Sequence, residues 1–188
     1  MGFDHFSFIA PIYARVTYSK ADVMCAVASL PVQGKLLDVG GGTGRVASAI
    51  REFVDEVIIA DVSLGMLQHA PLSTIRPVCG GSESLPFADN SFERVIMVDA
   101  LHHVIDHADT AHEMFRVLKP GGILVIEEPD IRTFGVKLIA LAEKLLLMRS
   151  HFLAPDAIMK LFEVGEKEIK ANDGTAWVII KKQVTLQA

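Results

Sequence analysis

The segment LLDVGGGTGRVA, residues Leu36–Ala47, is the part of this chain that says most about its architecture. Apolar residues run into an acid, Asp38, and glycines follow at alternate positions: Gly40, Gly42 and Gly44. Glycine has no Cβ, so the backbone turns tightly there and can lie close to a ligand. The helix expected next presents free N–H groups and the positive end of its dipole. The segment therefore predicts a strand, a glycine-rich turn and a helix that hold the polar end of a nucleoside-like cofactor.

Strand and helix patterns alternate along the rest of the chain. Nearly continuous apolar runs predict parallel strands, because the strands of a sheet covered on both faces are apolar throughout. The expected strands are Lys35–Val39, Glu56–Ala60, Ile75–Cys79, Arg94–Val98, Gly122–Glu127, Lys167–Lys170 and Thr175–Lys182. The expected helices are Arg45–Phe53, Leu64–Ala70, Thr110–Leu118, Ile131–Arg149 and Pro155–Phe162.

The last two expected strands flank Asn172-Asp173-Gly174, a strong hairpin signal. We therefore expect an α/β fold: a Rossmann-like, doubly wound, mostly parallel seven-stranded sheet that ends in an antiparallel hairpin, with helices on both faces.

Length and composition fit one ordinary domain, residues 1–188, whose first part, 1–30, is expected to form a helical cap. The chain is 51% apolar, and its net charge of -5 disfavours a broad nucleic-acid-binding surface. The N-terminus lacks a basic region followed by an apolar run, so we expect no signal peptide and a cytoplasmic protein. The longest apolar stretch, Phe134–Met148, is interrupted by charges, and we expect no transmembrane segment.

Five further segments carry a family resemblance. They are FIAPIY (Phe8–Tyr13), ADVSLGML (Ala60–Leu67), ESLPFADNSF (Glu83–Phe92), LHHV (Leu101–Val104) and EMFRVLKPGG (Glu113–Gly122). With the glycine-rich turn, this ordered series resembles the class I methyltransferases that use S-adenosylmethionine (SAM), in particular the small-molecule group typified by ubiquinone and menaquinone biosynthesis enzymes. The resemblance implies an enzyme that transfers a methyl group from SAM to a small-molecule acceptor and releases S-adenosylhomocysteine (SAH). It identifies neither the acceptor nor the atom methylated.

Three acids are the main candidates for cofactor contacts. Asp61 ends the second strand, where a carboxylate can accept hydrogen bonds from both ribose hydroxyls; the alternative is a cap for the next helix. The family places Asp38 near the methionine end of SAM; the alternative is an Asp that caps its own turn. Asp99 ends the fourth strand, at the edge where ligands bind in open α/β sheets, or else serves the turn there. The remaining expected cofactor-binding residues are Gly40, Gly42, Gly44, Val62, Met66, Ser82, Glu83 and Tyr13.

The chain departs from the family at Gly81, where an aspartate usually lies ahead of the E-x-L-P-F segment and accepts from the adenine amino group. The adenine contact must then come from Ser82, Glu83 or the backbone. Tyr13 closes over the site in one interpretation and packs as an ordinary aromatic in the other.

His102 and His103 are the candidate catalytic residues. Imidazole titrates near neutral pH and suits a general base, which methyl transfer needs only when the nucleophile arrives protonated. The alternative is a scaffolding role. The acids and histidines between 102 and 112 span a loop and a helix start, so we expect no metal site there. Cys25 and Cys79 have no metal-ligand spacing and are expected to be buried free thiols.

The helical insertion 131–163 follows the fifth strand, and the resemblance implies that it covers the acceptor site. Its helix has one apolar stripe at Phe134, Leu138, Leu141, Leu145 and Met148 and a second at Ile139, Ala142 and Leu146. The second stripe predicts an apolar or aromatic acceptor, a dimer contact, a membrane-surface contact, or burial on both sides. A monomer or a homodimer is compatible with it. Two other functions remain open: a SAM-binding protein without catalysis, and a nicotinamide-dependent oxidoreductase.

Overall fold

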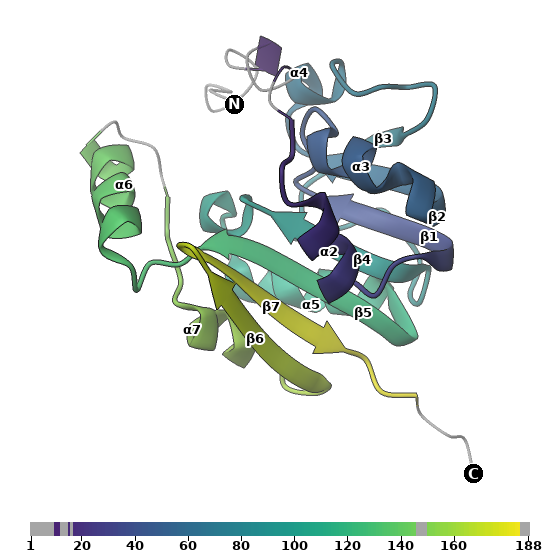
Figure 1. Cartoon of the computed structure of the whole chain (residues 1–188). Helices are drawn as coiled ribbons and strands as arrows, with labels where there is room; N and C mark the ends of the chain where they lie inside the picture. The colour runs from purple at the N-terminus through teal and green to yellow at the C-terminus, as the bar shows by residue number, and fades with distance from the viewer. Residues whose placement is uncertain (1–9, 12–14, 16, 146–149, 185–188) are drawn as a thin grey trace.

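The computed structural model of the chain describes residues 10–11, 15, 17–145 and 150–184. Its strands form one sheet in the order β3-β2-β1-β4-β5-β7-β6 (Figure 1). The strands are β1 (Val32–Val39), β2 (Val54–Asp61), β3 (Arg76–Cys79), β4 (Phe92–Val98), β5 (Leu118–Pro129), β6 (Glu166–Asn172) and β7 (Thr175–Lys181). The pairs from β3 to β5 are parallel, whereas β7 is antiparallel to both β5 and β6. The predicted fold class is confirmed.

The strand order reverses at β1. The chain passes from β1 outward to β2 and β3, and then returns to the other side of β1 as β4. Open parallel sheets bind ligands at such a reversal, beyond the carboxyl ends of the strands. The carboxyl ends of β1, β2 and β4 therefore define the place to look for a site.

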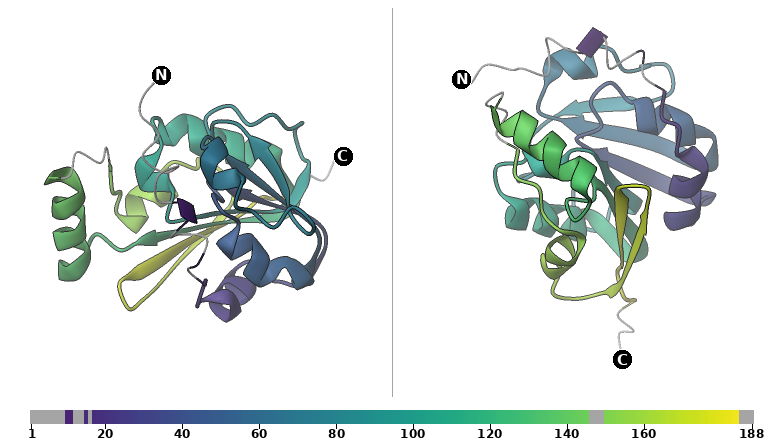
Figure 2. Two further views of the ribbon diagram at one scale, coloured as in Figure 1. Left: turned by 90° about the horizontal axis from the view of Figure 1, so that it is seen from above. Right: turned by 60° about the vertical axis from the view of Figure 1, so that its left-hand side comes forward.

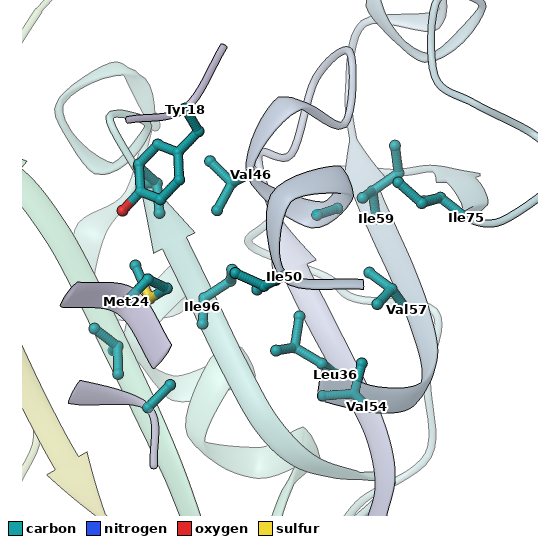
Figure 3. Close-up of a cluster of buried hydrophobic side chains, with 14 of the residues drawn as sticks. Tyr18, Met24, Leu36, Val46, Ile50, Val54, Val57, Ile59, Ile75 and Ile96 are labelled. Atoms are coloured by element: carbon teal, nitrogen blue, oxygen red, sulfur yellow. The ribbon is translucent and has the colours of Figure 1, made fainter. Parts of the chain in front are cut away.

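Two apolar cores lie on opposite faces of the sheet. Neighbouring residues of a strand point to opposite faces, so Leu36 joins one core and Leu37 the other, and both are fully buried. The helices α2 (Ala21–Val27) and α3 (Arg45–Ile50) contribute Met24 and Ile50 to the first core (Figure 3). On the second face, α5 (His107–Val117) and α7 (Pro155–Lys160) pack against β5 and β7. This two-sided burial explains the continuous apolar runs in the sequence.

The terminal hairpin forms where it was predicted. Asp173 and Gly174 have φ values of 47° and 75°, and two consecutive positive φ values are what a tight β-hairpin turn requires. β7 is buried between its neighbours, while β6 is a largely exposed edge strand that carries alternating Glu and Lys residues. Charged side chains on an edge strand oppose pairing with other chains.

The helix α6 (Phe134–Leu145) does not lie on the sheet. Figures 1 and 2 show it standing apart from the strands, and Phe134, Leu138 and Leu141 are 77%, 53% and 54% exposed. The helix therefore presents three residues of its first apolar stripe to solvent, while the side chains of Leu145 and Met148 lie outside the described residues. The side chains of the second stripe, Ile139, Ala142 and Leu146, lie outside the described residues.

Smaller differences from the predictions concern ends of elements and one thiol. The helix α4 (Leu64–Leu67) is shorter than the predicted Leu64–Ala70, and α3 gives way to a 3₁₀ turn at 51–53. The expectation of two buried thiols is wrong for Cys79, which is exposed because β3 is a short strand at the edge of the sheet, and Cys25 is only half-buried. Within the described part of the chain, no helix is long and apolar enough to cross a membrane.

Candidate cofactor site

A cavity of about 180 Å³ opens at the point where the strand order reverses. It is bounded by the ends of β1, β2 and β4 and by the loops that follow β3 and β4. Its lining residues are Gly40, Ala60, Asp61, Val62, Gly80, Gly81, Ser82, Glu83, Asp99, Ala100, His103, Val104 and Ile105. Seven of the thirteen site residues predicted from the sequence lie among them: Gly40, Asp61, Val62, Ser82, Glu83, Asp99 and His103.

The glycine-rich turn forms one wall of the cavity. Gly40 has a φ of 71°, and a Cβ there would lie 2.6 Å from the Cβ of Ala100. Gly42, with a φ of 54°, donates its N–H to Asp61 Oδ2 at 2.9 Å, and a Cβ there would lie 3.0 Å from Met66 Cε. Only a glycine at these positions permits both the positive φ and the close approach. Gly42, Gly44 and Met66 lie outside the lining.

Asp61 lies at the end of β2, in the cavity lining. Its Oδ2 accepts from the Gly42 N–H and its Oδ1 accepts from the Ser63 N–H at 2.7 Å. The N-cap of α4 is Ser63, whose side chain accepts from the Met66 N–H, so the alternative of Asp61 as the cap is wrong. An ionised carboxylate has about four acceptor positions. Asp61 therefore fixes the glycine turn to the end of β2 and places a carboxylate in the cavity lining.

Asp38 is buried behind the glycine turn and does not line the cavity. Burial raises the pKa of its carboxyl to about 7, although the Arg45 guanidinium and the Ala47 backbone N–H both act to lower it. Within the described residues, its Oδ2 has no hydrogen-bond partner. A buried carboxyl whose charge is only partly compensated favours the arrival of a positive group nearby.

Asp99 follows β4 in a left-handed conformation, with a φ of 52°, and its N–H donates to the carbonyl of Glu127. Its Oδ2 accepts from the Arg45 guanidinium at 2.7 Å. The guanidinium also lies over the ring of Tyr18, 5.8 Å from its centroid. Sequence reasoning found Asp99 but not Arg45.

The two histidines lie in different environments. His102 is buried: its Nδ1 is 2.5 Å from Glu128 Oε2, and its ring stacks on Phe152 with centroids 4.3 Å apart. His103 lines the cavity, and burial together with the neighbouring His102 lowers its pKa to about 4. His103 is therefore neutral near pH 7, and its lowered pKa makes it a weak base.

Glu128 holds the loop that carries these histidines. Its Oε1 accepts from the N–H groups of Ala100 and Leu101, at 2.9 and 2.8 Å, while Oε2 contacts His102. Sequence reasoning missed this residue. Its signal was the acid pair Glu127-Glu128 at the end of a continuous apolar strand, where two buried carboxylates need partners.

The far wall of the cavity is made by two loops that Glu83 ties together. Its Oε1 accepts from the Ile105 N–H at 2.9 Å. Gly81 lies beside it, and a Cβ on Gly81 would be 3.2 Å from Glu83 Oε2. Ser82 Oγ lies 3.1 Å from Thr110 Oγ1. Where the family usually has an aspartate at position 81, this wall therefore offers the hydroxyl of Ser82 and the carboxylate of Glu83.

Two other expectations concern this region. Tyr13 lies outside the described residues. Among the residues that are described, no group of three or more His, Cys, Asp or Glu side chains is arranged to hold a metal ion.

Comparisons with known proteins find similarities to methyltransferases. Residues 37–126 match the family model described as a methyltransferase domain. The demethylmenaquinone methyltransferase of Renibacterium salmoninarum is 39% identical over 117 residues, which are 60% of this chain and 48% of that protein. The ubiquinone/menaquinone biosynthesis C-methyltransferase UbiE of Haemophilus ducreyi is 36% identical over 105 residues, 50% of this chain and 40% of that protein. The chain thus spans about half the length of the curated relatives it matches.

Solved structures support the same fold. A crystal structure of a protein from Bacillus halodurans C-125 superposes with a TM-score of 0.76 at 20% identity. The superposition covers 89% of this chain and all of the other.

Proposed function

We propose that this chain, which has the class I methyltransferase fold and resembles the ubiquinone and menaquinone methyltransferases, binds SAM and transfers its methyl group to a small-molecule acceptor. The observation that carries the proposal is Asp61, a carboxylate bound to the glycine turn at the end of β2 and open to the cavity. That position suits the two hydroxyls of a ribose.

The residues present fit SAM. Asp61 would hold the ribose, and Glu83 and Ser82 lie on the wall available to adenine. The unpartnered Oδ2 of Asp38 and its raised pKa suit the positive charge of a sulfonium or an ammonium group, which would stabilise the ionised carboxyl.

The charges around the cavity favour SAM over a nicotinamide dinucleotide. Asp61, Glu83 and Asp99 line the cavity, and no lysine or arginine does so among the residues described. Three carboxylates oppose a pyrophosphate and favour a cationic ligand. The charges of the cavity therefore favour a nicotinamide-dependent oxidoreductase less than a SAM-binding protein.

When bound, SAM supplies an electrophilic methyl group on sulfur. The chain's own part is to hold the acceptor atom in line with that methyl group and to exclude water. His103 lines the cavity as a neutral imidazole, so we assign it the acceptance of a proton from an acceptor that arrives protonated. His102, bound to Glu128, holds the loop and the neighbouring ring in place.

We assign cover of the acceptor to the insertion 131–163. Its returning part already contacts the histidines: Phe152 stacks on His102, and Ser150 Oγ lies 3.4 Å from His103 Nδ1. The exposed residues Phe134, Leu138 and Leu141 of α6 give the same insertion an apolar surface. An apolar cover suits an apolar or aromatic acceptor better than a sugar or a nucleic acid.

Titration calorimetry with SAM, SAH and NAD tests the cofactor. We expect SAM and SAH to bind and NAD not to bind. Asp61→Ala should weaken SAH binding by about tenfold or more, because a half-buried acceptor of two ligand hydrogen bonds is lost. Asp55→Ala, at the opposite end of the same strand, is the matched control and should leave SAH affinity unchanged.

Catalysis needs a separate measurement. Transfer of a radiolabelled methyl group from SAM to a library of apolar and aromatic metabolites should give a labelled product. SAM binding without transfer to any member would favour a non-catalytic SAM-binding protein. Sedimentation of the same sample decides between a monomer and a homodimer.

A further inference from the structure

We propose that a second cavity, of about 410 Å³, binds a small aromatic carboxylate. Its lining residues are Lys35, Ile58, Arg76, Val78, Pro86, Phe87, Ala88, Ser91 and Phe92, and we call it the basic cavity. None of these residues lines the cofactor cavity. The inference therefore goes beyond the proposed function and does not depend on SAM binding.

The basic cavity lies where a loop, and not a helix, covers the sheet. Every lining residue among those described belongs to the strands β1 to β4 or to the loop between β3 and β4. Lys35 and Leu37 are two positions apart in β1 and so share a face, and Leu37 belongs to the core of the second face. Ile58 and Val78 pack in or against the same core. The cavity is therefore an open part of the second face, beside the covered core.

The interior of the basic cavity is apolar and partly aromatic. Ile58 and Phe92 are only 4% and 2% exposed, so they close its inner end. The rings of Phe87 and Phe92 meet edge to face, with centroids 5.0 Å apart and planes at 84°. Aromatic side chains offer their faces and edges to a further ring. A volume of about 410 Å³ is also in the range of small-molecule sites, roughly 300–1,000 Å³.

The loop that covers the cavity is fixed in place. The Arg116 guanidinium donates to the carbonyls of Leu85 and Phe87, at 3.1 and 2.8 Å. The Leu85 N–H donates to Glu113 Oε2 at 2.8 Å, and Ser91 Oγ donates to the carbonyl of Ala88 at 2.7 Å. A ligand therefore need not order this loop when it binds, which lowers the entropic cost of binding.

The charge of the cavity is opposite to that of the chain. Among the described lining residues are two cations, Lys35 and Arg76, and no acid, although the net charge of the chain is -5. Glu56 lies beside them: its Oε2 is 3.2 Å from Lys35 Nζ, and its Oε1 is 3.3 Å from Arg76 Nη1. One carboxylate compensates only one of two positive charges. A second carboxylate, carried by a ligand, is therefore the complementary group, and a guanidinium can bind it through two parallel N–H groups.

The test uses two ligands that differ in charge. In titration calorimetry at low ionic strength, trans-cinnamate should bind wild-type protein saturably, with one molecule per chain. Its neutral amide, trans-cinnamamide, has nearly the same shape and should bind more weakly, because it lacks the charge that the cations attract. Asp61→Ala alters the cofactor cavity and should leave cinnamate binding unchanged.

Three variants of exposed or half-buried side chains locate the site. Arg76→Gln and Lys35→Gln should each weaken cinnamate binding by about fivefold or more, because a charge-assisted contact is lost. Glu56→Gln should strengthen it by about threefold or more, because the competing carboxylate is removed. A gain in affinity cannot come from a loss of folding. Lys170→Gln, which removes an exposed lysine paired with Glu168 on β6, is the matched control and should leave the affinity unchanged.

Several results would overturn the inference. They are equal affinities for cinnamate and cinnamamide, cinnamate binding that Arg76→Gln and Glu56→Gln leave unchanged, and loss of cinnamate binding in Asp61→Ala. Failure of wild-type protein to bind cinnamate, benzoate or phenylacetate would do the same. None of these results bears on SAH binding, so the proposed function can hold while this inference fails.

Discussion

Asp38→Asn removes the ability of one buried side chain to ionise while nearly preserving its shape. Asp38 is 1% exposed, the Ala47 N–H donates to its carboxyl, and its second oxygen has no partner within the described residues. An amide oxygen can keep the bond from Ala47. The substitution therefore isolates the free-energy cost of a charge buried beneath the glycine turn.

The size and sign of the effect follow from the pKa. Burial raises the pKa of Asp38 to about 7 in the folded protein, against about 3.9 in an unfolded chain. The folded state thus holds this proton to a higher pH than the unfolded state does. The stabilisation from that proton is fully present below about pH 4 and is lost as pH rises to about 7, at about 1.4 kcal/mol per pH unit. Asparagine does not titrate, so relative to wild type the variant should gain about 2 kcal/mol between pH 5.5 and pH 8.

The assay is urea unfolding of the ligand-free protein, followed by circular dichroism at pH 5.5, 6.5, 7.2 and 8. Asp173→Asn removes an exposed carboxyl in the β6–β7 turn and is the matched control. Its stability difference from wild type should stay constant with pH. If the difference for Asp38→Asn is equally flat, Asp38 is ionised throughout and the argument from its burial is wrong.

Three further predictions concern the turn, the histidine loop and α6. Gly42→Val should abolish SAH binding in calorimetry while the far-UV spectrum stays folded, because a β-branched residue is strained at a φ of 54° and its Cβ would press on Met66; retained binding would show that the turn tolerates a side chain. Glu128→Ala should lower the free energy of unfolding by about 2 kcal/mol or more, since it strands the Ala100 and Leu101 N–H groups and His102; a loss below about 0.5 kcal/mol in urea unfolding would contradict this. Leu141→Asp, on the exposed stripe of α6, should leave folding and SAH affinity unchanged and reduce methyl transfer to an apolar acceptor; unchanged transfer would separate α6 from the acceptor site.

Much of the architecture was predictable from local patterns. The central strands are buried on both faces, which makes them continuous apolar runs, and the Asp173-Gly174 turn has backbone demands that few residues meet. Asp61 and the glycines were found because the segment after each strand lies at one edge of the sheet. These features depend on residues close together in sequence.

The details that were missed depend on residues far apart. In the sequence, Arg45 has the position of an ordinary first residue of a helix. Asp99 is 54 positions away in the chain, and the turn after β4 brings its carboxylate to the Arg45 guanidinium. The pattern Leu-His-His likewise cannot say which imidazole faces the cavity. A 3₁₀ turn held by Glu128 decides that, directing His102 into the core and His103 to the lining.

The solitary position of α6 was also beyond the sequence. Its apolar stripe has the spacing of a helix that packs on a sheet, yet α5 already packs on β5, and α7 packs on β6 and β7. A helix pattern predicts an apolar face but not the partner that meets it.

The central claim is that the cavity at the ends of β1, β2 and β4 binds SAM, and a crystal structure of the complex with SAH tests it most directly. We predict that the ribose hydroxyls lie within hydrogen-bonding distance of the Asp61 carboxylate and that adenine lies against the wall formed by residues 81–83. SAH bound elsewhere on the molecule, or bound in this cavity with its ribose away from Asp61, would contradict the account.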